Sequence, residues 1–435
     1  MLIYANQQLQ TGKKAVGAIL GASFLISFAL TVIMPNSFKI VSATSIVFSF
    51  IYCVIVYGRI IFSGPYFYYL YASYIITLFY LIIGRLNGAP DVAAGEVFLI
   101  YIFFPLVIGA QLTALLFLVD LKTIVRLLVY SVPVIAATVV YFFWAFRTLG
   151  PDAVRIFIET PNVVISEEGF VAATMHVYGS MIFIASGFFA SPGVVRNPFL
   201  RIIIFAIIAA IAFTSGRGSL VFSMLIGLCI FAGVAFFAST RRESLSHRML
   251  LLVLGSIVVV VGALVLQLLA GNEFGAGVVT NISDALGKLF PDHQNVGGLT
   301  RFDQLEALKH GIDSNWGLGA GHGTASFWYS DPEKPWRYEL VWVATVFRTG
   351  FLGAAVYAAP FLVTLFQGAR LIIGGKMDRF ETFVFSGFIA AFLSSNTNPY
   401  LEAYVFQWMY ILPIVYFLRR SEYVSFWRAN FASER

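Results

Sequence analysis

Two arginines stand in settings where proteins bind phosphate groups. Arg217 lies in the turn 214-TSGRGS-219, and Arg301 opens the segment 300-TRFDQLEALKHGI-312. A guanidinium group donates two parallel hydrogen bonds to a phosphate or diphosphate, and flanking glycines leave backbone N–H groups free to face the same anion. The pattern predicts an anion site at these residues. The alternatives are an interfacial Arg217 that reaches lipid headgroups and a solvated Arg301 on a surface helix.

Arg301 is predicted to lie in the first turn of a helix. Thr300 can cap this helix, and Asp303 at the third position completes a variant of the capping box. The beginning of a helix attracts anions, which favours a binding role for Arg301. One face of the helix is apolar and can lie on the membrane or on other helices; its residues are Phe302, Leu305, Leu308 and Ile312.

A glycine-rich loop, 317-GLGAGHG-323, follows this helix. It is not a dinucleotide-binding fingerprint, because no strand precedes it and no helical pattern follows. Its glycines are better suited to a close backbone approach to a ligand or to a neighbouring helix. His322 can titrate near neutrality and is a candidate base, although a single histidine in such a turn is often only a polar loop residue.

Glu339 heads the apolar run 338-YELVWVATVF-347, and the run is predicted to break at Arg348, Thr349 and Gly350. Beside Arg337, Glu339 forms either a plain ion pair or a general base whose pKa the environment adjusts. On one straight helix Arg348 faces away from Glu339, because nine residues correspond to about half a turn of rotation. Glu339 therefore ranks above Arg348 as a candidate to carry chemistry.

Other polar segments give weaker signals. The stretch 394-SSNTNPYLEAYVFQW-408 carries Asn396, Asn398, Tyr400 and Glu402, which either cap the following span or line the mouth of a cavity. No His, Cys or carboxylate cluster has the spacing of metal ligands, and no P-loop is present. The sequence therefore predicts no cofactor and no metal.

The composition requires these residues to be positioned by membrane helices. Hydrophobic residues make up 59% of the 435 residues and charged residues only 11%, with a mean hydropathy of +0.84. A soluble domain cannot bury that much apolar surface, so we expect an all-α polytopic bundle. About twelve spans are predicted near 15–34, 40–57, 66–84, 97–119, 127–146, 170–190, 202–214, 219–239, 249–270, 350–367, 381–395 and 402–418.

The basic residues predict an orientation. With the N-terminus in the cytoplasm, 17 of the 28 lysines and arginines fall in short cytoplasmic loops and tails, where the positive-inside rule applies. An even number of spans then puts both termini in the cytoplasm. The chain is expected to form one membrane domain, 1–435, with an inserted loop, 271–349, of short amphipathic helices on the far side. The net charge of +6 is explained by this topology and does not indicate nucleic acid.

Over residues 200–415 the sequence resembles the O-antigen ligase and polymerase superfamily. The resemblance rests on multiple spans, the turn 214-TSGRGS-219 between central helices, a long late loop, an Arg-led helix ending in 316-WGLGAG-321, and the Ser-Asn-Thr-Asn-Pro segment. It implies a GT-C-like fold in the bacterial inner membrane and metal-independent, inverting transfer of a glycan from a polyprenyl diphosphate at the periplasmic face. Arg217 and Arg301 would bind the diphosphate, with Arg337 and Arg348 as further substrate-binding candidates.

The resemblance leaves polymerase and ligase as alternatives. Ligases place a histidine just before the helix that follows the glycine-rich loop, where this chain reads 336-WRYEL-340 with Glu339. This favours a polymerase of lipid-linked repeat units, with Glu339 as the base and a chain-length regulator as a candidate partner. A ligase would instead use lipid A–core as acceptor and His322 as base. A transporter of lipid-linked glycans is the alternative from another class, and it would require charges buried within spans.

Overall fold

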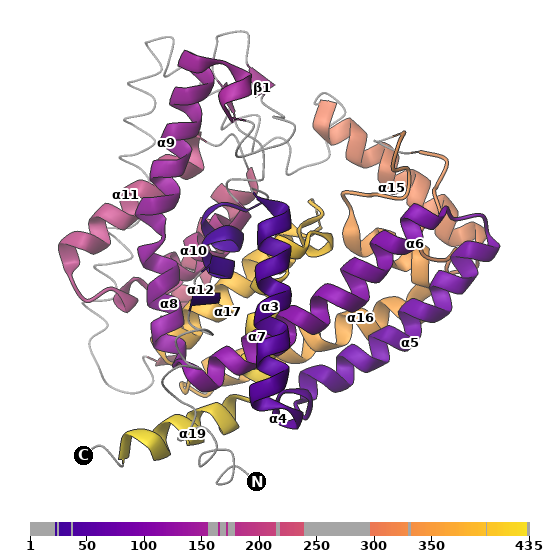
Figure 1. Cartoon of the computed structure of the whole chain (residues 1–435). Helices are drawn as coiled ribbons and strands as arrows, with labels where there is room; N and C mark the ends of the chain where they lie inside the picture. Colours follow the sequence, from indigo (N-terminus) through magenta and orange to yellow (C-terminus); the bar gives the residue numbers. More distant parts are fainter. Residues whose placement is uncertain are drawn as a thin grey trace. The chain divides into compact units, whose positions relative to one another are not determined.

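The computed structural model describes residues 22–23, 26–35, 38–154, 164–165, 171–172, 179–214, 218–238, 296–328, 332–396 and 398–432. Among these residues the secondary structure consists of helices and one short antiparallel pair, β1 (Val164–Ile165) with β2 (Val171–Ala172), joined by turns and loops. The all-α expectation is therefore confirmed (Figure 1). The chain divides into two compact units, which are described separately below.

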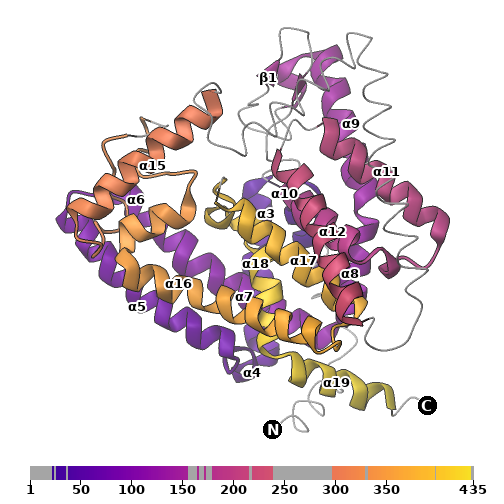
Figure 2. The same cartoon turned by 180° about the vertical axis from the view of Figure 1, so that it is seen from behind.

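Unit 1 comprises Met1–Ile124, Asp303–Leu365 and Ser395–Arg435. In unit 1, α7 packs against α3 and α18, and α5 runs beside the first part of α16 in both views (Figures 1 and 2). Nearly every side chain of α7 is buried, as expected of a helix that is apolar on all sides. Its elements are η1 (Ala29–Ile33), α3 (Lys39–Tyr57), α4 (Arg59–Phe62), α5 (Pro65–Leu86), α6 (Asp91–Phe98), η2 (Leu99–Phe103), α7 (Phe104–Leu118), the start of α8 (Leu121–Tyr130), the larger part of α15 (Val296–Ser314), the first part of α16 (Val341–Ile373), η5 (Tyr400–Glu402), η6 (Tyr404–Phe406), α18 (Trp408–Leu418) and α19 (Arg420–Ala432).

A widened helical turn connects α6 to α7. Residues Leu99–Phe103 form a π-helix, and Pro105 explains why: proline has no N–H to donate to the carbonyl of Tyr101 four residues earlier. Side chains of neighbouring helices bond to the carbonyls around this turn. Gln407 Nε2 donates to the Ile100 carbonyl at 2.9 Å, and Tyr74 donates to the Ile102 carbonyl at 2.7 Å. These bonds connect the turn that carries Tyr101 to α5 and to the residue before α18.

Unit 2 comprises Val125–Phe302 and Phe366–Ser394. Its helix α10 packs on α12 and α17. Small residues allow this close packing: Ser186 and Ser386 are hydrogen-bonded at 2.8 Å, and a Cβ atom on Gly187 would lie 2.7 Å from the Phe383 carbonyl oxygen. The elements that lie in or reach into this unit are α8 (Leu121–Tyr130), α9 (Val132–Leu149), η3 (Pro151–Val154), α10 (Gly179–Ala190), η4 (Pro192–Val194), α11 (Pro198–Thr214), α12 (Gly218–Ala238), α15 (Val296–Ser314), the end of α16 and α17 (Arg379–Ser394).

Six helical stretches of the described residues are long and apolar enough to cross a membrane: Ile40–Tyr57, Pro65–Leu86, Asp91–Leu118, Leu121–Phe146, Ser219–Phe237 and Val341–Ile373. Shorter apolar helices cover Ser180–Ala190, Pro198–Ala212 and Trp408–Leu418. The predicted span 249–270 lies outside the described residues, as do 15–21 and 24–25 of the predicted span 15–34. The predicted span 402–418 starts later, at Trp408, because two 3-10 turns precede the helix.

The predicted loop 271–349 contains more helix than expected. Helix α15 begins at Val296, so Thr300 lies inside it and the predicted cap at Thr300 is wrong. Leu308 of α15 is fully buried against Tyr338 and Phe347, which confirms an apolar contact face. Helix α16 begins at Val341, within the predicted loop. Its predicted interruption is confirmed at Gly350, where the backbone is not helical (φ 63°).

Candidate functional site

The glycine-rich loop completes the hydrogen bonds that the break in α16 leaves open. In a continuous helix the N–H of Phe351 would donate to the carbonyl of Phe347. Here Phe351 donates to the Gly317 carbonyl at 3.1 Å, and Ala320 donates to the Phe347 carbonyl at 2.8 Å. Gly321 donates to the Arg348 carbonyl at 2.9 Å. The loop is therefore an integral part of the helix bundle of unit 1.

The glycines of this loop allow backbone to approach backbone. A Cβ atom on Gly321, whose φ is +98°, would lie 2.2 Å from the Gly84 nitrogen of α5. A Cβ atom on Gly319 would lie 2.5 Å from the Gly350 nitrogen of α16. Of the two uses predicted for the loop, a close approach to a ligand or to a helix, the described contacts match the helix.

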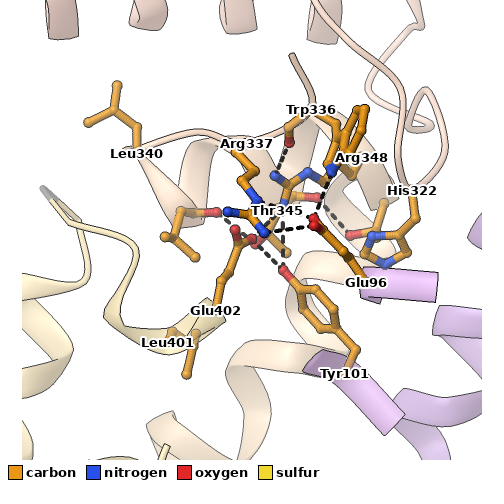
Figure 3. A network of polar contacts seen from close by, with 12 residues as sticks. Glu96, Tyr101, His322, Trp336, Arg337, Leu340, Thr345, Arg348, Leu401 and Glu402 are labelled. Atoms are coloured by element: carbon orange, nitrogen blue, oxygen red, sulfur yellow. Dashed lines mark hydrogen bonds and ion pairs between the residues drawn. The ribbon is translucent and has the colours of Figure 1, made fainter. Parts of the chain in front are cut away.

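Arg348 is the buried cation of this site (Figure 3). Its side chain is 5% exposed and is ion-paired through Nη1 with Glu402, whose side chain is 10% exposed. Nη1 also donates to the Tyr101 hydroxyl at 3.3 Å and Nη2 to the Trp336 carbonyl at 2.6 Å. The Tyr101 hydroxyl donates to Glu402 Oε1 at 2.6 Å. A buried charge needs such pairing, so Arg348 and Glu402 form the centre of a closed polar network.

A second cluster joins α6 to the loop before α16. The Glu96 carboxylate accepts hydrogen bonds from Lys334 Nζ at 3.1 Å and from the Trp336 indole at 3.0 Å. Arg337 adds a two-point contact, Nε to Oε2 at 3.1 Å and Nη2 to Oε1 at 2.7 Å. We call Glu96, Lys334, Trp336 and Arg337 the Glu96 cluster. The Trp336 carbonyl also accepts a hydrogen bond from Arg348, so Trp336 belongs both to the Glu96 cluster and to the Arg348–Glu402 network.

His322 lies beside this network and is shielded from water. The residue is 1% exposed, its ring centre is 5.0 Å from that of Tyr101, and Nε2 is 3.1 Å from the Tyr357 hydroxyl. That hydroxyl is also 2.6 Å from Thr77 Oγ1. Burial, and then the nearby charge of Arg348, lowers the pKa of His322 to about 3. A histidine with so low a pKa is a weak base, which supports the lower rank that the sequence gave it.

This burial predicts a pH-dependent stability. A histidine titrates near pH 6.5 in the unfolded chain, so protons bind preferentially to the unfolded state below that pH. The contribution of His322 is complete above pH 6.5 and is lost as the pH falls towards 3. Between pH 7 and pH 5 we expect a loss of roughly 2 kcal/mol. Thermal unfolding of His322→Gln should lack this slope, whereas His310→Gln, at an exposed position, should retain it.

An aromatic cavity adjoins the network on the side of the spans. It has a volume of about 110 Å³ and lies among α5, the η2 turn, α16 and α18. Tyr101 and Thr345 belong both to its wall and to the surroundings of Arg348 (Figure 3). Its surface is mostly apolar, with Tyr66, Tyr69, Trp342, Tyr357 and Tyr410 as the main aromatic residues. Such a cavity suits an apolar chain or a ring that stacks on aromatic groups.

The structure distributes the predicted site residues unevenly. Arg337 and Arg348 lie in adjoining clusters with His322 nearby. Glu339 is half-buried just before α16, and Arg301 is half-buried on α15. Arg217 lies outside the described residues, so the convergence of Arg217 with Arg301 stays a prediction. The described residues hold no group of three or more His, Cys, Asp or Glu side chains that could bind a metal.

Sequence reasoning missed Glu96, Tyr101, Lys334 and Trp336, and named Glu402 only as a possible cap or cavity residue. For Glu96 there was a signal: it is a carboxylate within the apolar run that continues to Leu118. An acidic residue so placed needs a partner. No comparable signal marked Tyr101, one of 21 tyrosines.

Composition and helices together define an α-helical membrane protein. Known proteins add nothing to that description: no family of proteins matches the chain, and no curated protein or solved structure is detectably similar to it.

Proposed function

We propose that the protein is a membrane glycosyltransferase that polymerises oligosaccharide repeat units linked to a polyprenyl diphosphate. The observation that carries this proposal is that the partly exposed cations Lys334 and Arg337 are connected, through Trp336 and the buried Arg348, to an apolar cavity among the spans. Arg348 lies seven residues after the start of α16, or about 10 Å along the helix. The wall of the aromatic cavity includes Tyr101 and Thr345, which also lie close to Arg348 (Figure 3). An amphiphile with an anionic head and an isoprenoid tail fits this combination.

The positions of the basic residues support a periplasmic site in the bacterial inner membrane. In unit 1, α5 extends from Gly64, which Arg419 approaches, to Gly84, which His322 approaches. Arg419 and Arg420 follow α18 at the first end, whereas the glycine-rich loop lies at the second. By the positive-inside rule the first end is cytoplasmic, as are both termini, and the loop faces the periplasm.

In this reaction the acceptor hydroxyl attacks the anomeric carbon of the donor, and the bond from that carbon to the diphosphate oxygen breaks. Arg217 and Arg301 bind the diphosphate and stabilise the charge on the leaving group, with Arg337 as a further contact. Glu339 takes the proton of the acceptor hydroxyl. No metal is required. Burial of His322 supports this assignment over a ligase that would use His322 as base and lipid A–core as acceptor.

The proposal predicts which surface glycan is lost. Arg301→Ala should lower polymer synthesis at least 100-fold, because a charge-stabilising contact in the transition state is typically worth that factor. Glu339→Gln should lower turnover by a similar factor with less effect on donor binding. Electrophoresis of surface glycans should show single repeats on lipid A–core, while Lys309→Ala, an exposed position on the same helix, should give full-length chains.

Two results would contradict the assignment. Normal chain length in Arg301→Ala and Arg217→Ala would remove the diphosphate role, and an active Glu339→Gln would remove the base. If the inactive variants instead accumulated free lipid-linked polymer and left lipid A–core bare, the protein would be a ligase and not a polymerase.

A transporter of lipid-linked glycans remains the second candidate, and one observation favours it. Arg348 and Glu402 are buried as a pair, and Arg348 lies within a helix long enough to cross the membrane. Buried charges in spans often mark transport pathways. Purified protein in proteoliposomes separates the two: a polymerase lengthens the glycan on one leaflet, whereas a transporter moves unaltered donor between leaflets.

A further inference from the structure

The Glu96 cluster places two cations on one oxygen atom. Lys334 Nζ and Arg337 Nη2 both contact Glu96 Oε1, at 3.1 and 2.7 Å, and the Trp336 indole contacts the other oxygen. Two positive groups so close together repel each other unless an anion lies between them. The cluster is therefore built around an anion, which in this structure is the Glu96 carboxylate.

The donors of this cluster match the chemistry of a phosphate group. Arg337 presents two parallel donors, the arrangement that recognises phosphate as well as carboxylate. Lys334 adds a point charge and Trp336 a neutral donor. Without Glu96 the two basic side chains leave a local charge of +2, which favours a multiply charged anion over a single carboxylate.

Solvent access separates this cluster from the neighbouring Arg348–Glu402 pair. The Arg348 and Glu402 side chains are only 5% and 10% exposed, so that pair is sealed. The side chains of Lys334 and Arg337 are 34% and 50% exposed, whereas that of Glu96 is 19% exposed. A ligand can therefore reach the two cations from solution and compete with Glu96 for them.

We propose that Lys334, Trp336 and Arg337 form a binding site for a phosphate or diphosphate group, and that Glu96 occupies it as an internal competitor when the ligand is absent. The anion that arrives displaces the carboxylate and takes over its hydrogen bonds. This deepens the proposed function, on which it rests, by identifying a switch at the donor site: Glu96 keeps the site closed until a diphosphate-bearing ligand binds.

The test measures binding to the purified full-length protein by calorimetry. Two probes are used: inorganic pyrophosphate in solution, and polyprenyl diphosphate in lipid nanodiscs. Glu96→Gln removes the competing charge, so we expect a roughly fivefold tighter affinity, the scale of a half-exposed ion pair. Asp91→Asn is the matched control, because Asp91 lies on the same helix and pairs with Arg85 outside the cluster; its affinity should equal that of the wild type.

Further variants keep the test decisive. Arg337→Ala and Lys334→Ala in the wild-type background should each weaken binding severalfold, and Glu96→Gln with Arg337→Ala should lose the gain. A higher affinity for both probes supports a site that binds diphosphate from either source. A higher affinity for the nanodiscs alone supports a site that binds diphosphate only when it is attached to a lipid. Unchanged affinity for both probes in Glu96→Gln, or in both alanine variants, would overturn the proposal.

The binding measurement is independent of glycan transfer. Tighter pyrophosphate binding in Glu96→Gln without any glycan transfer by the wild type would reject the polymerase and keep the switch. Glycan transfer by the wild type, together with unchanged pyrophosphate binding in every variant, would keep the polymerase and reject the switch.

Discussion

Replacing Arg348 with methionine is expected to lower the free energy of unfolding by about 3–5 kcal/mol. The substitution keeps much of the side-chain volume. Among the described residues it leaves the buried Glu402 carboxylate with the Tyr101 hydroxyl, a neutral group, as its donor. It also removes the donor to the Trp336 carbonyl. Both losses act on groups from which water is excluded, where an unpaired polar group is most costly. Thermal or denaturant unfolding of the protein in detergent measures the change.

A second substitution shows whether the loss of stability comes from the unpaired charge or from altered packing. Arg348→Met combined with Glu402→Leu should recover most of the lost stability, because no charge is then left buried without a partner. Arg370→Met, an exposed position on the same helix, should change the stability by less than about 0.5 kcal/mol. A double variant as unstable as Arg348→Met alone would show that packing around Arg348, and not its charge, is what stabilises this region.

The case of Arg348 shows what local pattern can and cannot predict. Glu339 lies before the first residue of α16, so helical rotation does not relate it to Arg348. The partner that Arg348 does contact, Glu402, is 54 residues away in the chain. No periodicity connects those two positions. The sequence indicated only that Glu402 is a polar residue before an apolar helix.

Fold prediction succeeded where one physical requirement dominates. Apolar runs of about 20 residues must form helices in a membrane, and α3, α5 and α12 follow their predicted ranges within a few residues. Boundaries were less predictable where helices continue into polar segments, as at Val296 and Val341. The π turn at Tyr101 follows from Pro105. Hydropathy is averaged over a window of many residues, so the effect of this one proline on the helix does not appear in it.

The glycine-rich loop is the part of the site that the sequence described best, and it leads to the second large effect. Gly84→Ala is expected to destabilise the protein by about 3 kcal/mol. Helix propensity alone would favour alanine here by about 1 kcal/mol. However, the new Cβ atom would lie 1.9 Å from the His322 carbonyl oxygen and 3.0 Å from the His322 nitrogen. These are backbone atoms and cannot rotate away, so the loop must move.

Movement of the loop should be visible beyond the loss of stability. The His322 N–H bond to the Tyr80 carbonyl and the Asn87 bond to the Ala320 carbonyl would both be strained, so limited proteolysis should cut Gly84→Ala faster between 315 and 340. Gly95→Ala is the matched control, because a Cβ atom on that exposed helical glycine meets nothing within 4 Å. It should be neutral or stabilising by about 0.5–1 kcal/mol. Equal effects of the two substitutions would mean that helix propensity, and not contact with the loop, explains the glycine at position 84.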